Sequence, residues 1–278
     1  MASGRCVKTF ALALGAGGAR GLAHIAVIEA LDEMDVRPVA IAGASIGAVI
    51  GAGYAAGLSG RAMRRHLIKV AHDRGEVLRR VMAARAVAWS EILGAGFGNP
   101  LVVDGGKFYD AFLAELLPPN FADLKTPLTL IAADLHGLEA IAFTTGELKV
   151  AISASMAVPG LVRPVEIDGR VLVDGGTVDP LPFGVLRGKA DVVLAVDVSG
   201  GPAERKGVPD PWESLFAAIT LMGHTIVAEK LKSGAPDLVL RPNIGIFRML
   251  DFLQASAILR AAEPIKAEVR EKLGALLA

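Results

Sequence analysis

The 23 residues from 38 to 60, none of which carries a charge, constrain the fold of this chain most. A helix of that length would cross a bilayer, and glycines recur at every fourth position near its middle, as in a membrane helix-packing motif. However, six of the 23 residues are glycine, which is a poor helix former. We therefore expect a buried strand at 39–44, a sharp turn, and a buried helix at 46–56.

Segments of strand and helix character alternate along the remaining sequence. Further strands are expected at 9–14, 129–134, 140–144, 163–167, 170–173, 192–198 and near 238–241, and further helices at 21–34 and 148–156. This alternation predicts an α/β fold with a largely parallel sheet, and Asp168-Gly169 predicts a hairpin turn. The sequence shows no convincing domain boundary. We expect one domain over 1–278, with a variable segment at about 60–125 as a candidate lid and a mainly helical part at about 212–278.

Charge and cysteine content exclude some classes of function. Lysine plus arginine equals aspartate plus glutamate at 29 each, so the net charge of zero gives no argument for a nucleic-acid partner. The single cysteine, Cys6, cannot form an internal disulfide, so nothing marks an oxidising compartment. The apolar stretch 10–19 has the length of a signal-peptide core, but it runs into Arg20 without a clear cleavage site. We expect a cytoplasmic protein, with peripheral contact to a membrane left open.

The predicted turn between the strand at 39–44 and the helix at 46–56 contains a candidate nucleophile, Ser45. Residues 43–47 read Gly-Ala-Ser-Ile-Gly, the G-x-S-x-G pattern, and the strand–turn–helix context is the one this motif requires. The two glycines remove side chains that would clash where the chain reverses. The helix N-terminus favours a developing oxyanion. The alternative is a serine that merely caps a helix, and the context favours the nucleophile.

A second glycine-rich loop, at 15–21, follows the first predicted strand. A dinucleotide-binding fingerprint needs glycine at the sixth position, which is Arg20, and the terminal Gly-Lys-Ser/Thr of a P-loop is absent. The remaining interpretation is an oxyanion hole, in which the N–H groups of Gly17 and Gly18 point at the acyl oxygen. Each well-placed donor is worth about 2.7–4 kcal/mol to the transition state. Arg20 either holds the loop, binds an anionic substrate group, or forms a surface ion pair.

A nucleophilic serine needs a base, and histidine is the usual one. The chain has histidines at positions 24, 66, 72, 136 and 224. In α/β-hydrolases the order is serine, acid, histidine, and only His224 follows every candidate acid. His224 lies in a predicted helix rather than a loop, which favours a structural role. His24 sits in the first predicted helix, where a structural role is also favoured.

A carboxylate is the other candidate base. Asp174-Gly175-Gly176 directly follows an apolar strand, which puts Asp174 at the same sheet edge as Ser45 if the two strands are parallel. Burial raises the pKa of a carboxylate and makes it a better base. Asp104-Gly105-Gly106 follows an equally apolar segment, so the local pattern alone does not separate the two aspartates.

Taken together, the motifs resemble those of the patatin-like phospholipases, in particular the bacterial relatives of neuropathy target esterase. The resemblance rests on the loop ending in Arg20-Gly21 and continuing through 22–25, on the elbow at 43–47, and on Asp174-Gly175-Gly176 continuing to 180–182. The three motifs occur in the family's order and cover at least 9–199. Together they are far more specific than any one of them.

The resemblance implies a three-layer α/β/α sandwich with a mostly parallel central sheet. It implies a serine acyl hydrolase with a Ser-Asp dyad and no histidine, in which Ser45 is the nucleophile and Asp174 the base. Gly15, Gly17 and Gly18 would supply the oxyanion hole. Lipids or other fatty-acyl esters are the implied substrates, and no metal or organic cofactor is expected. Asp104 falls in the region where members of this family vary, so the resemblance favours Asp174 over Asp104 as the base.

Two departures from the family pattern concern residues beside the implied site. Ala16 interrupts what is often an unbroken glycine run, and we expect a modest effect because it lies early in the loop. Asp179 stands where relatives often carry asparagine. A second acid near Asp174 would raise the pKa of Asp174 by like-charge repulsion.

Other functions stay open beside the dyad. One is a Ser-Asp-His hydrolase that uses His224, and another is a lipid-binding or regulatory protein on a hydrolase scaffold. The segment 61–85 carries eight lysines or arginines against two acids, which fits either a surface for anionic lipid or a solvated helical face balanced by acids elsewhere. The glycine-rich piece 94–98 is a candidate mobile lid.

Overall fold

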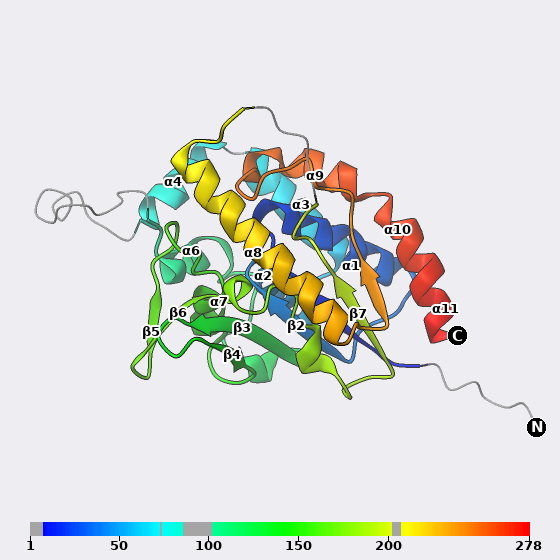
Figure 1. Ribbon diagram of the computed structural model, residues 1–278. Coiled ribbons are helices and arrows are strands. Elements are labelled where there is room, and N and C mark those ends of the chain that lie inside the picture. Colours follow the sequence, from blue (N-terminus) through cyan, green and yellow to red (C-terminus); the bar gives the residue numbers. More distant parts are fainter. Residues whose placement is uncertain (1–7, 73, 86–101, 202–206) are drawn as a thin grey trace, which may run out of the picture.

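A sheet of eight strands forms the centre of the protein (Figure 1). The computed structural model describes residues 8–72, 74–85, 102–201 and 207–278. The strands are β1 (Phe10–Leu14), β2 (Ala40–Ala44), β3 (Leu128–Asp134), β4 (Glu139–Phe143), β5 (Val165–Ile167), β6 (Arg170–Asp174), β7 (Val192–Val196) and β8 (Leu238–Leu240). Their order is β5-β6-β3-β2-β1-β7-β8, and β4 also pairs with β3. The strands β3, β2, β1, β7 and β8 are parallel, and β4, β5 and β6 add antiparallel pairs.

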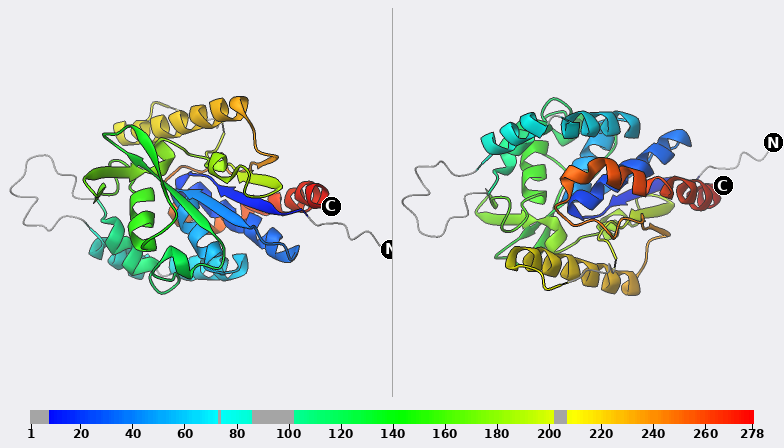
Figure 2. Two further views of the ribbon diagram at one scale, coloured as in Figure 1. Left: turned by 90° about the horizontal axis from the view of Figure 1, so that it is seen from below. Right: turned by 90° about the horizontal axis from the view of Figure 1, so that it is seen from above.

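Helices cover both faces of this sheet. The α-helices are α1 (His24–Glu33), α2 (Ile46–Ala55), α3 (Gly60–His72), α4 (Arg74–Ala83), α6 (Gly105–Phe112), α7 (Leu148–Ser155), α8 (Pro211–Ser233), α9 (Ala255–Ala262), α10 (Ile265–Glu268) and α11 (Gly274–Leu277). Short helical turns are η1 (Gly18–Ala23), η2 (Phe121–Asp123), η3 (Gly175–Thr177), η4 (Phe183–Leu186), η5 (Phe252–Gln254) and the π-turn η6 (Val269–Leu273). Figure 2 shows α8 on one side of the sheet and α1 to α3 on the other. The fold is therefore the expected three-layer α/β/α sandwich.

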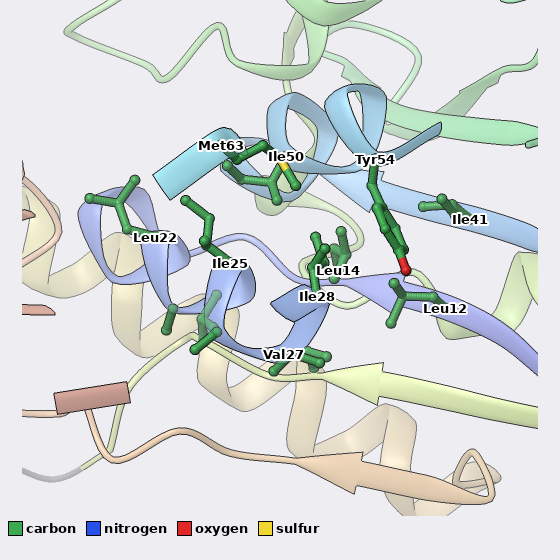
Figure 3. Close-up of a cluster of buried hydrophobic side chains, with 14 of the residues drawn as sticks. Leu12, Leu14, Leu22, Ile25, Val27, Ile28, Ile41, Ile50, Tyr54 and Met63 are labelled. Carbon is green, nitrogen blue, oxygen red and sulfur yellow. The ribbon is translucent and has the colours of Figure 1, made fainter. Parts of the chain in front are cut away.

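Alternate residues of β1 pack into different layers of the core. Leu12 and Leu14 join the large cluster with α1 and α2, which Figure 3 shows. Ala11 and Ala13 face the other way and pack with Phe183 and with Val227 of α8. This follows from the two-residue period of a strand. Because layers of side chains cover both faces of the sheet at β1, all five residues of this strand are apolar.

The predicted strands are all present, with ends that differ by one or two residues. The hairpin turn is confirmed, because Asp168 (φ 51°) and Gly169 (φ 76°) both have the positive φ of a type I′ turn. The stretch 10–19 forms β1 and the start of the glycine loop. The helix predicted at 21–34 begins earlier as η1 and becomes α-helical at His24. None of the described helices combines the length and the apolar character needed to cross a membrane.

The basic stretch 61–85 forms most of α3 and α4. Arg64 pairs with Glu29 of α1 at 2.6 Å, and Arg61 lies 4.0 Å from Glu33. Part of the basic excess is therefore balanced by acids of α1, as one of the two interpretations predicted. Residues 94–98, the candidate mobile lid, lie outside the described residues.

Strands β2 and β6 occupy the same edge of β3. Strand β4 pairs with Leu130–Asp134 of β3, a range that includes residues paired with β2 and residues paired with β6. Because a residue can pair with only one strand on each edge, β4 lies on one edge of β3 and both β2 and β6 lie on the other. The edge opposite β4 therefore holds β2 first, with Ala44 opposite Ile131, and then β6, with Asp174 opposite Ala132. Our prediction assumed that the strand before Asp174 was parallel to β2. It is antiparallel, and the two strands instead meet end to end.

Candidate active site

Ser45 lies on a tight turn between β2 and α2. Its backbone has φ 56° and ψ −125°, a conformation that L-residues rarely adopt and that costs free energy unless the surroundings fix it. A Cβ on Gly47 would lie 2.1 Å from the carbonyl oxygen of Leu14, so only glycine allows this approach of the elbow to β1. Ser45 itself is buried. The structure therefore has the strand–turn–helix geometry that the motif predicted.

Ser155, at the end of α7, supports the backbone of Ser45. Its Oγ accepts a hydrogen bond from the backbone N–H of Ser45 at 3.1 Å, and its side chain is fully buried. The role of Ser155 was not predicted from the sequence. A serine inside an apolar helix has no local pattern that reveals its partner, and the only hint was a polar residue in the predicted helix at 148–156.

Asp174 contacts Ser45 directly. Its Oδ2 accepts a hydrogen bond from Ser45 Oγ at 2.6 Å, and its Oδ1 accepts one from the N–H of Gly176 at 2.7 Å. Its backbone N–H donates to the carbonyl of Ala157. Burial raises the pKa of Asp174 to about 6, although the hydrogen bonds from Ser45 and Gly176 oppose that rise. A carboxylate with this pKa is ionised at neutral pH and accepts a proton more readily than an exposed one.

Asp179 does not perturb Asp174 as the sequence suggested. Its Oδ1 forms an ion pair with Lys230 of α8 at 2.5 Å, which compensates its charge. The raised pKa of Asp174 is instead due to burial. The like-charge effect that we expected from this departure is therefore absent.

The competing aspartate and histidines lie elsewhere. Asp104 caps α6, where its Oδ1 accepts the N–H of Lys107 at 2.9 Å. His224 is exposed on α8, and neither hydrogen bond of the Asp174 carboxylate comes from it. His24 is fully buried, and burial lowers its pKa to about 4. Its Nε2 lies 2.9 Å from the carbonyl oxygen of Gly15, so neutral His24 holds the glycine loop.

The glycine loop packs against both other motifs. A Cβ on Gly176 would lie 2.7 Å from that of Ala16, and the N–H of Ala16 donates to the carbonyl of Pro180 at 2.8 Å. The N–H of Gly15 donates to the carbonyl of Val196 at 3.0 Å, extending the pairing of β1 with β7. Gly15 is therefore removed from the expected oxyanion donors, because its only N–H is already used.

Gly17 and Gly18 remain as candidate donors. Their N–H groups make no backbone hydrogen bond to a described residue outside η1. Both residues line the same cavity as Ser45. Both glycines thus lie in the wall of the cavity that contains the serine hydroxyl.

Arg20 is buried beneath this loop. Its Nε donates to the carbonyl of Gly17 at 3.3 Å, and one Nη donates to Thr220 of α8. Of the three roles considered, the position of Arg20 away from the surface favours the two that involve the loop or the cavity. The contact with Gly17 supports the loop.

A cavity of about 590 Å³ extends from Ser45 between the helices. Its polar lining, among the described residues, comes from Gly17, Gly18, Arg20, Ser45, His66, Asp174, Gly176, Thr177, Ser199 and Thr220. The rest of the described wall is mainly apolar, with side chains from α2, α3, α6, α8 and η5. The variable segment at 60–125 therefore supplies much of the wall. A cavity with a mainly apolar wall and a few polar groups, among them Ser45 and Asp174, fits an ester with a long acyl chain.

Comparison with known proteins agrees with this arrangement. Residues 12–187 match the family model for patatin-like phospholipase. An NTE family protein of Mycobacterium tuberculosis, described as uncharacterized, is 39% identical over 194 residues, which cover 69% of this chain and 50% of that protein. Lysophospholipase NTE1 of Coccidioides immitis is 26% identical over 292 aligned residues, covering 96% of this chain and 18% of that protein.

This chain thus spans about half the length of its mycobacterial relative. Among solved structures, VipD from Legionella pneumophila matches with a TM-score of 0.50 at 14% identity, covering 94% of this chain and 66% of VipD. That likeness concerns the fold alone. The family model covers well over half of the sequence and includes the glycine loop, the elbow and Asp174. The chain belongs to the patatin-like phospholipase family.

Proposed function

We propose that this protein is a serine acyl hydrolase that cleaves lipid or other fatty-acyl esters with a Ser45–Asp174 dyad. The observation that carries the proposal is the 2.6 Å hydrogen bond from Ser45 Oγ to Asp174 Oδ2, two residues that line a largely apolar cavity. A buried carboxylate with a pKa of about 6 is a competent general base at neutral pH. No histidine is needed in this scheme.

The reaction has two halves. Asp174 takes the proton of Ser45 Oγ as that oxygen attacks the acyl carbonyl, and the N–H groups of Gly17 and Gly18 stabilise the resulting oxyanion. Asp174 then returns the proton to the leaving alcohol, and an acyl-enzyme forms on Ser45. In the second half Asp174 deprotonates a water that attacks the acyl-enzyme. The fatty acid leaves, and the proton returns to Ser45.

The Asp174 carboxylate is oriented for this work by its second oxygen. Because Oδ1 is held by the N–H of Gly176, Oδ2 is directed at Ser45. Ser155 Oγ accepts the N–H of Ser45 and so holds the strained backbone of Ser45. Each reacting group therefore has its own supporting hydrogen bond, a preorganisation that catalysis in a buried site requires.

The apolar wall of the cavity and the names of the relatives support lipid substrates. Each buried methylene contributes about 0.8 kcal/mol of transfer free energy, so a cavity lined by leucine, isoleucine, valine and phenylalanine favours long acyl chains. One relative is named a lysophospholipase. We propose lysophospholipids and simple fatty-acyl esters as the substrate class.

A fluorophosphonate probe tests the proposal without knowledge of the substrate. The purified chain is treated with the probe, and the adduct is mapped by mass spectrometry, with Asp174→Asn and Asp104→Asn beside it. An adduct on Ser45 that Asp174→Asn abolishes and Asp104→Asn leaves intact is the expected result. Folded protein without an adduct on Ser45 would overturn the proposal and favour a lipid-binding protein on a hydrolase scaffold.

A further inference from the structure

Six large apolar side chains in the first turns of α8 and in the segment 246–253 are exposed, and three of them also line the cavity. Ile246 is 76% exposed, Leu253 72% and Trp212 52%, and Leu215, Leu250 and Phe252 are also exposed. We call these six residues the rim. Single exposed apolar side chains are ordinary on protein surfaces. A group of six is typical of a surface that binds a ligand, another protein or a membrane.

The rim is continuous with the cavity rather than merely near it. Leu250, Phe252 and Leu253 line the cavity and are exposed at the same time. The backbone carbonyl of Met249 accepts the N–H of Ala19, so this segment sits directly on the glycine loop. These exposed side chains and Ser45 therefore line one cavity.

An ion pair joins the two halves of the rim. Arg248, in the loop before η5, pairs with Glu213 in the first turn of α8 at 3.2 Å. A Cβ on Gly160 would lie 3.5 Å from Trp212 and 3.8 Å from Leu215, so both side chains pack against the cavity wall at 158–162. Figure 1 shows the first turn of α8 and the start of α9 at the top of the molecule. The rim is thus one surface.

Two of the described charged residues beside the rim pair with each other, and a third accepts a backbone hydrogen bond. Arg248 is paired with Glu213, and the carboxylate of Asp251 accepts the backbone N–H of Arg248 at 2.7 Å. The sequence of α8 from 214 to 228 contains no charged residue, although much of that face is exposed. A surface of this kind loses little when it leaves water for an apolar medium.

We propose that the rim docks on the surface of a lipid aggregate and lets an acyl chain move from that aggregate into the cavity. The proposal rests on the proposed function, because the acyl chain is the occupant that the cavity and the rim share. Tryptophan is well suited to such an interface, since its ring is apolar and its N–H stays near water. This places the lipid contact on α8 and η5 rather than on the basic stretch at 61–85 or the candidate lid.

The test is binding of the full chain to phosphatidylcholine vesicles by flotation. The double variant Leu215→Glu/Ile246→Glu puts charge on the rim, at residues that do not line the cavity. The matched control is Leu138→Glu, which changes a leucine that is 86% exposed on the β3–β4 turn. That hairpin lies across the lower part of Figure 1, away from the rim. We expect at least a tenfold weaker vesicle partition for the double variant and no change for the control.

Fluorescence adds a direct readout. Trp89 and Trp212 are the only tryptophans of the chain, so in a Trp89→Phe background the emission reports Trp212 alone. We expect a blue shift when vesicles are added, and none in the double variant. The uncharged variant Leu215→Gln/Ile246→Gln should also weaken binding, which guards against misfolding caused by buried charge.

The outcomes separate this inference from the proposed function. Because neither variant residue lines the cavity, the soluble fluorophosphonate probe should label Ser45 equally in all variants. If the probe labels Ser45 and the double variant floats as wild type does, the proposed lipid contact of the rim is wrong and the proposed hydrolase activity is unaffected. Flotation that depends on the rim, without labelling of Ser45, supports the surface and overturns the hydrolase. A double variant that loses self-association on gel filtration, with flotation unchanged, would mean that the rim binds a second copy.

Discussion

Ser45 and Asp174 lie at the facing ends of two strands that share one edge of β3. The residue before Ser45 pairs with Ile131, and Asp174 pairs with the next residue, Ala132. The 2.6 Å contact between Ser45 Oγ and Asp174 Oδ2 is therefore fixed by the hydrogen bonds of the sheet rather than by a loop. In the proposed dyad the backbone would therefore orient the base, and no third residue would be needed for this.

The pH dependence of the reaction should report Asp174. The carboxyl must be ionised to accept the proton of Ser45, and burial raises its pKa to about 6. We expect kcat/KM for a neutral ester to fall about tenfold per pH unit below pH 6 and to be flat above it. Initial rates between pH 4.5 and 9 with p-nitrophenyl butyrate measure this. A profile that still climbs between pH 7 and 9 would contradict a carboxylate base.

The same raised pKa predicts a cost in stability. A buried acid whose pKa is raised in the folded state stabilises that state while it is protonated, and this stability is lost as the pH rises from about 4 through about 6. The shift corresponds to roughly 3 kcal/mol. Asp174→Asn should therefore gain up to this much free energy of unfolding at pH 8 and only about a third of it at pH 4.5. Urea unfolding at both pH values is the measurement, and an equal difference at the two would disprove the linkage.

Replacing His224 should leave the activity nearly unchanged. His224 is exposed on α8, and the two hydrogen bonds of the Asp174 carboxylate come from Ser45 and Gly176. We expect His224→Ala to retain kcat/KM within about twofold, since exposed residues away from a site contribute little. The variant is compared with wild type on the same ester. A loss of a hundredfold or more would instead support a Ser-Asp-His triad.

The elements that could be predicted from the sequence are those whose signals are local. The elbow, the glycine loop and the Asp168-Gly169 turn each carry their conformation in a few adjacent residues, and the structure has them where the pattern put them. The direction of β6 could not be predicted in this way. It depends on which strand pairs with the free edge of β3, and that choice is made by tertiary packing.

Roles that depend on contacts between distant residues were also hidden. Asp104 and Asp174 share the same Asp-Gly-Gly pattern, and both cap a helical turn, so only their surroundings separate them. Gly15 looked equivalent to Gly17 and Gly18 until the pairing of its N–H with Val196 was visible. In each case the local pattern gave the backbone conformation, whereas the partner of each polar group was set by the fold.

Ser155 and Ser153 provide a matched pair of buried serines on α7. Ser155 Oγ accepts the N–H of Ser45, whereas Ser153 Oγ has no hydrogen-bond partner among the described residues. Ser155→Ala leaves a buried N–H unsatisfied at the strained elbow, which costs about 1–3 kcal/mol. We expect that loss in the free energy of unfolding and about a tenfold slower fluorophosphonate labelling of Ser45. Ser153→Ala should be neutral in both measurements, and equal effects of the two variants would remove Ser155 from its positioning role.

The length of the acyl chain should be limited by the wall of α2. Gly53 lines the cavity and lies eight residues after Ser45, which is about 12 Å along the helix axis. A Cβ there would be 3.2 Å from Met63 Sδ, the flexible end of a side chain, so a larger residue fits at modest cost but fills the cavity. Gly53→Leu should therefore spare short esters and disfavour long ones, with Gly53→Ala intermediate.

The expected size of this effect follows from the methylenes that the larger side chain excludes. Each one lost from the cavity lowers kcat/KM by up to about fourfold, which corresponds to about 0.8 kcal/mol. In wild type, kcat/KM should rise by the same factor for each methylene added to the ester until the cavity is full. A series of p-nitrophenyl esters from butyrate to palmitate measures both slopes. If Gly53→Leu lowers the rates for butyrate and palmitate by the same factor, the acyl chain does not run along α2.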